Sequence, residues 1–257
     1  MPIVEPTNTE VKSYKGLHLY HSGVSNCSMR VRMTLEEKGQ PWTSHHLNIL
    51  KKEHITPEYF GINPNGLVPT LVHDGTVIIE SDDIIDYLDD AFPEPPLKPT
   101  AGPPRDDMYH WLRRATAIHV QAVKTYIYFK RVGTKMSHSE EEDSKYRSLQ
   151  KNETLLEFHR KSGSEGFSED DVAAAKATLD QCFGEMDTIL AEHDWLAGDA
   201  FSLADIAWVP LQVTLEKLAG YDFNKLSHVG AWTERLKQRS SYRDGVSKWW
   251  PSAMGEV

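Results

Sequence analysis

Apolar and polar positions alternate between strand-like and helix-like spacing in the first part of the chain. Residues 16–21 (GLHLYH) are a short run typical of a strand, and residues 42–48 (WTSHHLN) are a second one. Between them, the stretch after Ser25 has apolar residues at helical spacing up to Gly39, a common C-terminal stop signal. The pattern therefore predicts a strand, a helix and a strand in this order.

A hairpin and another helix follow. Residues 68–81 (VPTLVHDGTVIIES) contain two apolar runs on either side of Asp74-Gly75, a dipeptide typical of tight hairpin turns. Residues 81–92 (SDDIIDYLDDAF) then begin with a serine and two acids and carry apolar residues on one face, which predicts a helix. The predicted order of this part is βαβαββα, a mixed sheet with helices around it.

Proline marks a boundary in the chain. Residues 93–104 (PEPPLKPTAGPP) are so rich in proline that we expect a linker without a helix or a central strand. Beyond it strand patterns disappear, and the apolar spacing is helical. The sequence thus predicts a mixed α/β domain at 14–92 and an all-α domain at 105–257.

Three other segments complete the pattern. Residues 132–168 are polar, with an acidic run, and are expected to form a solvated helix extension with a loop. In residues 201–206 (FSLADI), Ser202 and Asp205 have the spacing of a capping box, and a nearly all-apolar helix follows, which indicates a role in folding. Residues 1–15 lack the apolar core of a signal peptide and are interpreted as a poorly ordered lead-in.

Composition excludes several kinds of partner. The 257 residues carry a net charge of -10, which argues against nucleic acid, since phosphate binding requires clustered Lys and Arg. No run approaches the roughly 20 apolar residues that cross a membrane. Cys27 and Cys182 cannot form a disulfide framework, which suits a reducing compartment such as the cytoplasm. The histidines lack the Cys/His spacing of zinc sites, so we expect no metal.

Two segments favour a site for a small peptide with an anionic group. Ser25 precedes a helix whose first N–H groups and partial positive charge favour an anion, although a serine here more commonly only caps the helix. Pro69 interrupts a strand pattern. A cis Val68–Pro69 bond would turn the Val68 backbone outward to pair with an extended ligand; the alternative is an ordinary edge-strand proline.

A third segment adds polar groups of both signs. Glu80-Ser81 lies where the last strand meets a helix. The serine hydroxyl and nearby N–H groups can hold a carboxylate, and the Glu80 carboxylate can hold an ammonium group. The alternative is again a capping residue. Together the three segments predict a cradle for a small zwitterionic peptide.

These motifs resemble those of the soluble glutathione transferase family. Residues 25–32 (SNCSMRVR) are similar to the SSCSWRVR motif of the zeta class and the SPFGMRVR motif of the tau class. Residues 63–71 (NPNGLVPTL), 80–88 (ESDDIIDYL) and 201–208 (FSLADIAW) resemble the cis-proline strand, the γ-glutamyl-binding helix start and the capping-box helix of that family. The resemblance implies a thioredoxin-like N-terminal domain followed by an all-helical C-terminal domain.

The resemblance also implies roles at matching positions. Ser25 falls on the catalytic serine that stabilises the glutathione thiolate, and Asn26, where the zeta motif has serine, would help or replace it. Val68, before the cis Pro69, would pair with the cysteinyl backbone. The remaining implied contacts are the γ-glutamyl end at Glu80 and Ser81, and the glycyl carboxylate at His54 as in the theta class, with Lys51 and Lys52 as alternatives.

The implied activity is a serine-type glutathione transferase with glutathione as co-substrate and no metal. The thiolate would attack a small hydrophobic electrophile, in conjugation or in ether cleavage, and the long 132–168 segment is similar to that of bacterial glutathione-dependent β-etherases. The alternatives are a cis–trans isomerase of the maleylacetoacetate type and a non-catalytic glutathione- or ligand-binding protein. A cytoplasmic homodimer is implied. Aromatic residues of the first long helical region either line the electrophile pocket or pack the core, namely Tyr109, Trp111, Tyr126, Tyr128 and Phe129.

Overall fold

The N-terminal part of the chain is built on a five-stranded mixed sheet. The structure, a computed structural model, describes residues 3–132, 139–255 and 257. The strand order is β1-β5-β4-β2-β3; β2 and β3 are parallel and the other neighbours are antiparallel. The strands are β1 (Ile3–Val4), β2 (Leu17–His21), β3 (Trp42–His46), β4 (Thr70–His73) and β5 (Thr76–Ile78).

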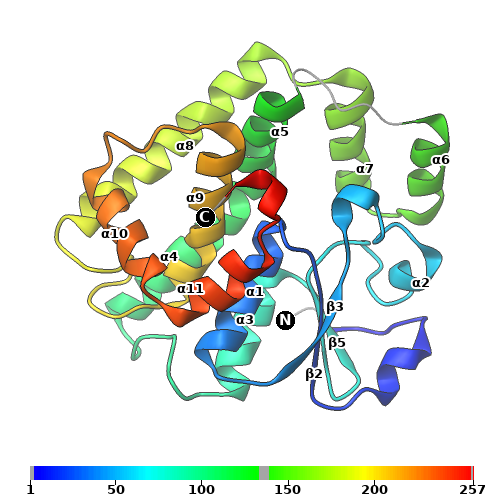
Figure 1. Cartoon of the computed structure of the whole chain (residues 1–257), viewed down its shortest axis with the longest axis horizontal. Coiled ribbons are helices and arrows are strands. Elements are labelled where there is room, and N and C mark those ends of the chain that lie inside the picture. Colours follow the sequence, from blue (N-terminus) through cyan, green and yellow to red (C-terminus); the bar gives the residue numbers. More distant parts are fainter. Residues whose placement is uncertain (1–2, 133–138, 256) are drawn as a thin grey trace.

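Helices cover both faces of this sheet. Helices α1 (Asn26–Glu37) and α3 (Ser81–Ala91) pack on one face, and the short α2 (Pro57–Phe60) lies on the other (Figure 1). Adjacent residues of a strand point to opposite faces, so Leu19 and Tyr20 of β2 belong to separate apolar clusters. From β2 onward the predicted βαβαββα order is confirmed.

The expectation of a poorly ordered lead-in is wrong for residues 3–13. In β1, Ile3 and Val4 pair with Ile78 and Val77 of β5, and the 3-10 helix that follows buries Val11 completely. The added strand gives β5 a hydrogen-bonded neighbour instead of an open sheet edge. Two residues are too few to show a period of two, which is why the pattern did not predict the strand.

In the described residues of the C-terminal part, the regular elements are helices, joined by loops (Figure 1). Its helices are α4 (Pro103–Ala117), α5 (Thr125–Val132), α6 (Glu140–Leu149), α7 (Glu153–Arg160), α8 (Glu169–Leu190), α9 (Leu203–Ala219), α10 (Ser227–Lys237) and α11 (Ser240–Gly245).

Two sequence expectations for this part need correction. Helix α4 begins at Pro103, inside the segment predicted to be free of helix, because prolines in the first turn of a helix lose no helical hydrogen bond. In the polar 132–168 segment, of which residues 133–138 lie outside the described residues, the structure has two separate helices, α6 and α7, and the π-helical turn Lys161–Glu165, rather than one helix extension with a loop.

Helix α9 is the centre of the helical part. Its residues from Leu203 to Leu215 are all buried, as the apolar sequence predicts. The capping box at its start is confirmed, and the Asp205 carboxylate is completely buried. Its two oxygens accept hydrogen bonds from the Leu196 and Ser202 N–H groups, the Ser202 hydroxyl and the Trp232 indole N–H. Asp205 therefore joins three segments of the domain.

The C-terminal segment returns to the N-terminal domain. The Arg32 side chain of α1 is fully buried and donates to the carbonyl oxygens of Gly245 at 2.7 Å and of Ser22 at 2.8 Å. A β-carbon placed on Gly23 would lie 2.2 Å from the carbonyl oxygen of Trp249. The backbone after α11 thus rests directly on the turn between β2 and α1 (Figure 1).

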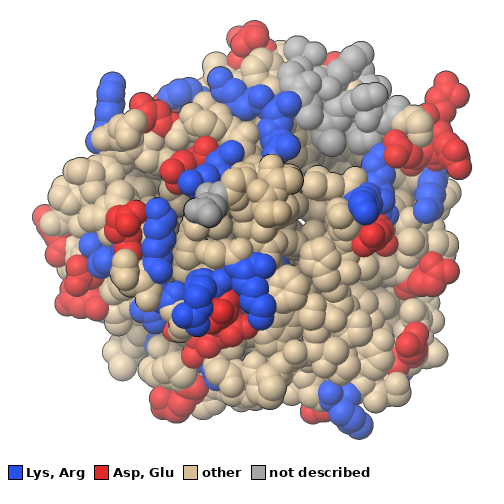
Figure 2. Space-filling model, in the orientation of Figure 1, with Lys and Arg blue, Asp and Glu red and all other residues tan. Residues whose placement is uncertain are grey.

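The surface carries both charges. Figure 2 shows Lys and Arg interspersed with Asp and Glu, and a largely uncharged area to the right of the centre of this face. None of the helices in the described part of the chain is both long and apolar enough to cross a bilayer.

Candidate functional site

Ser25 lies at the N-terminus of α1 with two hydrogen-bonding roles. Its hydroxyl oxygen accepts from the Ser28 N–H at 3.2 Å, which caps the helix. The same hydroxyl donates to the Val68 carbonyl at 3.4 Å. Capping and site formation are therefore combined in one residue. The helix end directs its partial positive charge toward the position where Ser25 and Val68 meet.

The loop that carries Val68 is held firmly against the sheet. The Val68–Pro69 peptide bond is cis, as predicted from the interrupted strand pattern. The carbonyl of Leu67 accepts hydrogen bonds from the Asn63 side chain at 2.9 Å and from the Tyr59 hydroxyl at 2.6 Å. This bonding fixes the backbone next to Ser25, so the Val68 backbone has one defined position beside the hydroxyl.

Glu80 and Ser81 follow β5 directly. Glu80 is the N-cap of α3 and makes no side-chain capping bond, so the interpretation of Ser81 as the cap is wrong. Its φ of 65° lies in the left-handed region, which non-glycine residues adopt mainly where surrounding contacts impose it. The Asn65 amide donates to the Glu80 carboxylate at 3.5 Å. Ser81 is nearly buried and can still offer its backbone N–H at the helix start.

A buried arginine lies beneath this serine. Arg30 of α1 is 1% exposed and donates to the Ser81 hydroxyl at 3.2 Å, to the Thr116 hydroxyl at 3.3 Å and to the Ala207 carbonyl at 3.1 Å. Its Nη2 has no hydrogen-bond partner among the described residues. A cation at this depth favours negative charge in the site above it. Sequence reasoning missed Arg30, although it belongs to the RVR end of the quoted motif.

His119 is a second residue that sequence reasoning missed. It opens the π-helical turn His119–Lys124, and its Nε2 lies 3.5 Å from the Asn26 amide nitrogen, while Nδ1 lies 3.9 Å from Cys27 Sγ. Burial, together with the charges of Lys124 and Arg30, holds the pKa of His119 well below its ordinary value. The imidazole is therefore neutral near pH 7. Asn26 thus faces His119 of the helical part, whereas Ser25 faces the Val68 carbonyl of the N-terminal domain.

His54 lies in the turn before α2, apart from Ser25. Its Nδ1 is buried without a hydrogen-bond partner in the described part of the chain. Burial and the charges of Lys124 and Lys52 lower the pKa of His54 to about 4. A neutral imidazole whose Nδ1 has no partner among the described residues can supply a hydrogen bond to an incoming carboxylate, while the Lys52 charge is already paired with Glu142.

The candidate aromatic residues differ in burial. Trp111 and Tyr126 are at most 5% exposed and belong to the main apolar cluster, so core packing holds for both. Tyr128 and Phe129 are partly buried against the same cluster, and Tyr109 donates to Asp86 at 2.8 Å. Two of the five aromatics are therefore removed from the candidate pocket wall.

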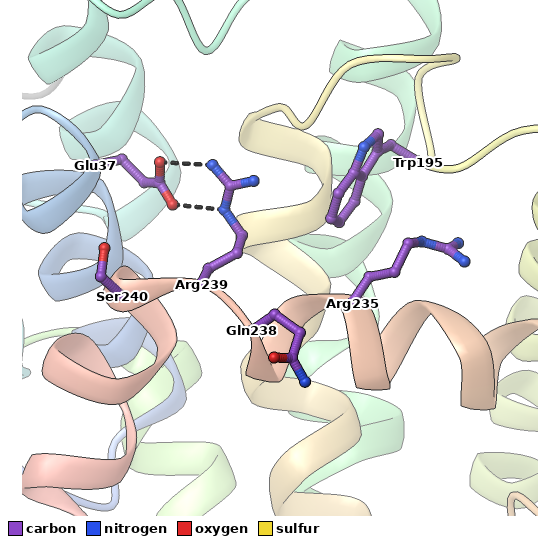
Figure 3. A pocket seen from close by; sticks show the side chains of 6 residues that line it. All are labelled: Glu37, Trp195, Arg235, Gln238, Arg239 and Ser240. Carbon is purple, nitrogen blue, oxygen red and sulfur yellow. Dashed lines mark hydrogen bonds and ion pairs between the residues drawn. The ribbon is translucent and has the colours of Figure 1, made fainter.

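A surface pocket of about 460 Å³ lies elsewhere. It is formed at the C-terminal end of α1, where Glu37 accepts two hydrogen bonds from Arg239, with Trp195 and Arg235 opposite (Figure 3). Twelve helical residues separate Glu37 from the Ser25 end, which is roughly 18 Å at 1.5 Å per residue. This pocket therefore does not belong to the site. The described residues contain no group of three or more His, Cys, Asp or Glu able to hold a metal ion.

Comparisons with known proteins find matches to both the N-terminal and the C-terminal part of the chain. The family model for the glutathione S-transferase N-terminal domain matches residues 19–96, and the model for the C-terminal domain matches residues 136–240. Protein LigF of Sphingobium sp. strain SYK-6 is 28% identical over 90% of this chain and 93% of its own length. Glutathione S-transferase 1 of Dianthus caryophyllus is 45% identical, but the match spans 32% of this chain and 38% of that protein.

Solved structures show the same fold. The crystal structure of the beta-etherase LigF matches with a TM-score of 0.79 at 26% identity, covering 89% of this chain and 98% of that one. A theta class glutathione S-transferase from Xanthomonas axonopodis pv. citri, with glutathione bound, matches with a TM-score of 0.69 at 23% identity, over 91% of this chain and 98% of that one. With both family domains matched in order and the same fold along nearly the whole chain, this protein belongs to the glutathione transferase family.

Proposed function

We propose that the protein is a serine-type glutathione transferase, which ionises the thiol of glutathione for attack on a hydrophobic electrophile. The observation that carries the proposal is the Ser25 hydroxyl at the start of α1, in contact with the Val68 carbonyl beside the cis Pro69. Glutathione would lie with its cysteinyl backbone at Val68, its γ-glutamyl end at Glu80 and Ser81, and its glycyl carboxylate at His54.

The energetics of ionisation support this role. A free thiol has a pKa of about 8.5, and lowering it by about two units requires roughly 2.7 kcal/mol of preference for the thiolate. A hydrogen bond to a charged acceptor contributes about 1.5–3 kcal/mol. The helix N-terminus contributes about 0.3–1 kcal/mol more. Ser25 and α1 are together sufficient, with Arg30 as an additional buried cation and Asn26 as a second donor.

Similarity in the helical part, which would hold the electrophile, supports ether cleavage over isomerisation. The match to maleylacetoacetate isomerase of Pseudomonas aeruginosa is confined to 84 residues, which are 32% of this chain. In contrast, the match to LigF includes the helical part. In the proposed reaction the thiolate attacks the carbon that bears an aryloxy group. The C–S bond forms as the C–O bond breaks, and the phenolate leaves and takes a proton from water.

A direct assay separates the two reactions. We expect the purified protein, with glutathione and an alkyl aryl ether, to release the phenol and form the glutathione thioether in equal amounts. A maleyl compound should be isomerised more slowly, if at all. Both products can be followed by chromatography. Isomerisation without any thioether product would favour the isomerase, and binding of glutathione without either reaction would favour the non-catalytic alternative.

Glutathione binding should weaken as the pH falls. Partial burial and the carboxylates of Asp82 and Asp83 raise the pKa of Glu80. Glu80 must be ionised to hold an ammonium group. As the pH falls, Glu80 takes up a proton at a higher pH than an ordinary glutamate does, and the Kd for glutathione should begin to rise at that pH. Calorimetric titration across acidic pH measures this. Glu80→Gln should bind more weakly at neutral pH and lose this dependence; an unchanged pH profile in this variant would contradict the assignment.

The assembly and location of the protein are part of the proposal. We propose the domain boundaries 14–92, 93–104 and 105–257, with the co-substrate site in the last part; residues 3–13 join the first domain through β1, and α4 of the last domain begins at Pro103. We also propose a cytoplasmic homodimer. The free thiols of Cys27 and Cys182 are consistent with a reducing compartment, and light scattering after gel filtration tests the dimer.

A further inference from the structure

Helices α6 and α7 form a separate layer over the N-terminal domain. Figure 1 shows them on the side of the molecule that carries α2, and α7 also contacts α5, where the Phe158 and Tyr128 ring centroids are 5.9 Å apart. Lys52, in the N-terminal domain, forms a 2.7 Å ion pair with Glu142 of α6. The turn between the two helices, residues 150–152, points at the loop that contains Asn65. This layer therefore contacts the part of the chain that leads to the candidate γ-glutamyl site.

Gln150 anchors the turn. It is 1% exposed, and its Nε2 donates to the Asn65 backbone carbonyl at 2.9 Å and to the Tyr146 hydroxyl at 3.3 Å. Its Oε1 accepts from the N–H groups of Lys151 at 3.0 Å and Asn152 at 2.9 Å. Both the oxygen and the nitrogen of the Gln150 amide form hydrogen bonds, so its orientation is fixed. The amide thereby holds the turn to Asn65, a residue 85 positions earlier in the sequence.

Hydrogen bonding by Asn152 fixes the orientation of the Asn65 side-chain amide. Its Oδ1 accepts from the Thr154 and Leu155 N–H groups as the N-cap of α7, which leaves Nδ2 as the end that faces outward. That Nδ2 donates to Asn65 Oδ1 at 3.2 Å. The Asn65 amide must then present its own Nδ2 on the opposite side, where the Glu80 carboxylate accepts from it at 3.5 Å.

We propose that the α6–α7 turn is a positioning element for the γ-glutamyl site, acting through Asn152 and Asn65 on Glu80. The two asparagines form a relay in which each amide has one allowed orientation. By occupying Glu80 Oε1, the relay directs the other carboxylate oxygen to the ammonium group of the γ-glutamyl residue. This inference rests on the proposed function, since it assigns Glu80 to that ammonium. It gives the polar segment that contains α6 and α7 a role in selecting glutathione over thiols without the γ-amino group.

Asn152→Asp tests the relay with little change in shape. Aspartate caps a helix as well as asparagine does, so α7 keeps its start. The Nδ2 donor is replaced by a carboxylate oxygen, which attracts the NH2 group of Asn65 away from Glu80. We expect the Kd for glutathione to rise about three- to tenfold, from the loss of one hydrogen bond. The Kd of the analogue that lacks the γ-glutamyl amino group should change by less than about twofold, because a neutral end does not use the Glu80 charge.

The decisive measurement is the Kd of the analogue divided by the Kd of glutathione, which is the preference of the protein for glutathione. General loosening of the fold would weaken both ligands equally, whereas loss of the relay reduces the preference for glutathione alone. Asn8→Asp is the matched control, because Asn8 also caps a helix through Oδ1 and donates Nδ2 to a backbone carbonyl, that of Glu58, which is not part of the relay. It should leave the ratio unchanged.

A second variant covers the case in which Asn152→Asp does not fold. Asn65→Ala removes the middle of the relay and should lower the ratio by a similar factor, and adding Asn152→Asp to it should lower the ratio no further. An unchanged ratio in both single variants, with glutathione still bound, would overturn the relay but not the proposed function. Failure of the wild-type protein to bind glutathione would overturn the proposed function itself.

Discussion

Replacing Ser25 with alanine is expected to raise the pKa of the bound glutathione thiol by about one to two units. The hydroxyl is the side-chain donor at the start of α1, and a hydrogen bond to a thiolate contributes about 1.5–3 kcal/mol. At pH 7, with a wild-type thiol pKa of about 6.5, the thiolate fraction and kcat/KM should then fall by about 3- to 25-fold. Thiolate absorbance at increasing pH, with glutathione bound, measures the shift directly, and binding itself should persist.

The variant needs a control because Ser25 also caps α1. Loss of an N-cap costs about 1 kcal/mol of stability in its own right. Ser168→Ala removes a cap of the same type at the start of α8, where Ser168 accepts from the Asp171 N–H. It should lower stability to a similar extent without changing the thiol pKa. If the thiol pKa is the same in Ser25→Ala as in the wild type, the activating donor is Asn26, and Asn26→Ala becomes the next variant.

Asp205→Ala is expected to destabilise the protein by about 3–5 kcal/mol. The buried carboxylate accepts hydrogen bonds from the Leu196 and Ser202 backbone and from the Trp232 indole. Alanine leaves these donors without partners in a region closed to water, and each buried orphan costs about 1–3 kcal/mol. Urea unfolding followed by circular dichroism measures the change, and the melting temperature should fall by roughly 6–20 °C.

The control for this variant is another aspartate of the same region. Asp199 is exposed, and its contact with His193 is at the surface. Exposed ion pairs contribute little, so Asp199→Ala should change stability by less than about 1 kcal/mol. Equal effects of the two substitutions would show that the buried capping box does not have the stabilising role assigned to it.

Features fixed by neighbouring residues were predictable from the sequence. Helix α1 begins after Ser25 because a serine caps it, and the Asp74-Gly75 turn has positive φ at both residues, as its composition requires. The cis bond before Pro69 and the capping box at Asp205 have signatures within a few residues. In each case the local sequence contains all the groups that form the structure.

Contacts between distant segments were not predictable in this way. His119 meets Asn26 across 93 residues, and Arg30 reaches Thr116 across 86. The relay joins Asn152 to Asn65 across 87 residues. A lone histidine, arginine or asparagine has no periodic pattern that identifies its partner, so the electrostatics of the site depend on how the two domains pack. The sequence indicated candidate site residues in the N-terminal domain, but it missed Arg30 of that domain and His119 of the helical part.

The close approach of Gly23 to the carbonyl of Trp249 also bears on evolution. Gly23 has no positive φ that would require glycine, so the restriction on its side chain comes from the backbone more than two hundred residues later. Relatives whose C-terminal segment follows the same path should therefore keep glycine at position 23, whatever residue stands at position 249. A relative with any side chain at position 23 must lead its C-terminal segment along another path, and that one alignment column separates the two groups.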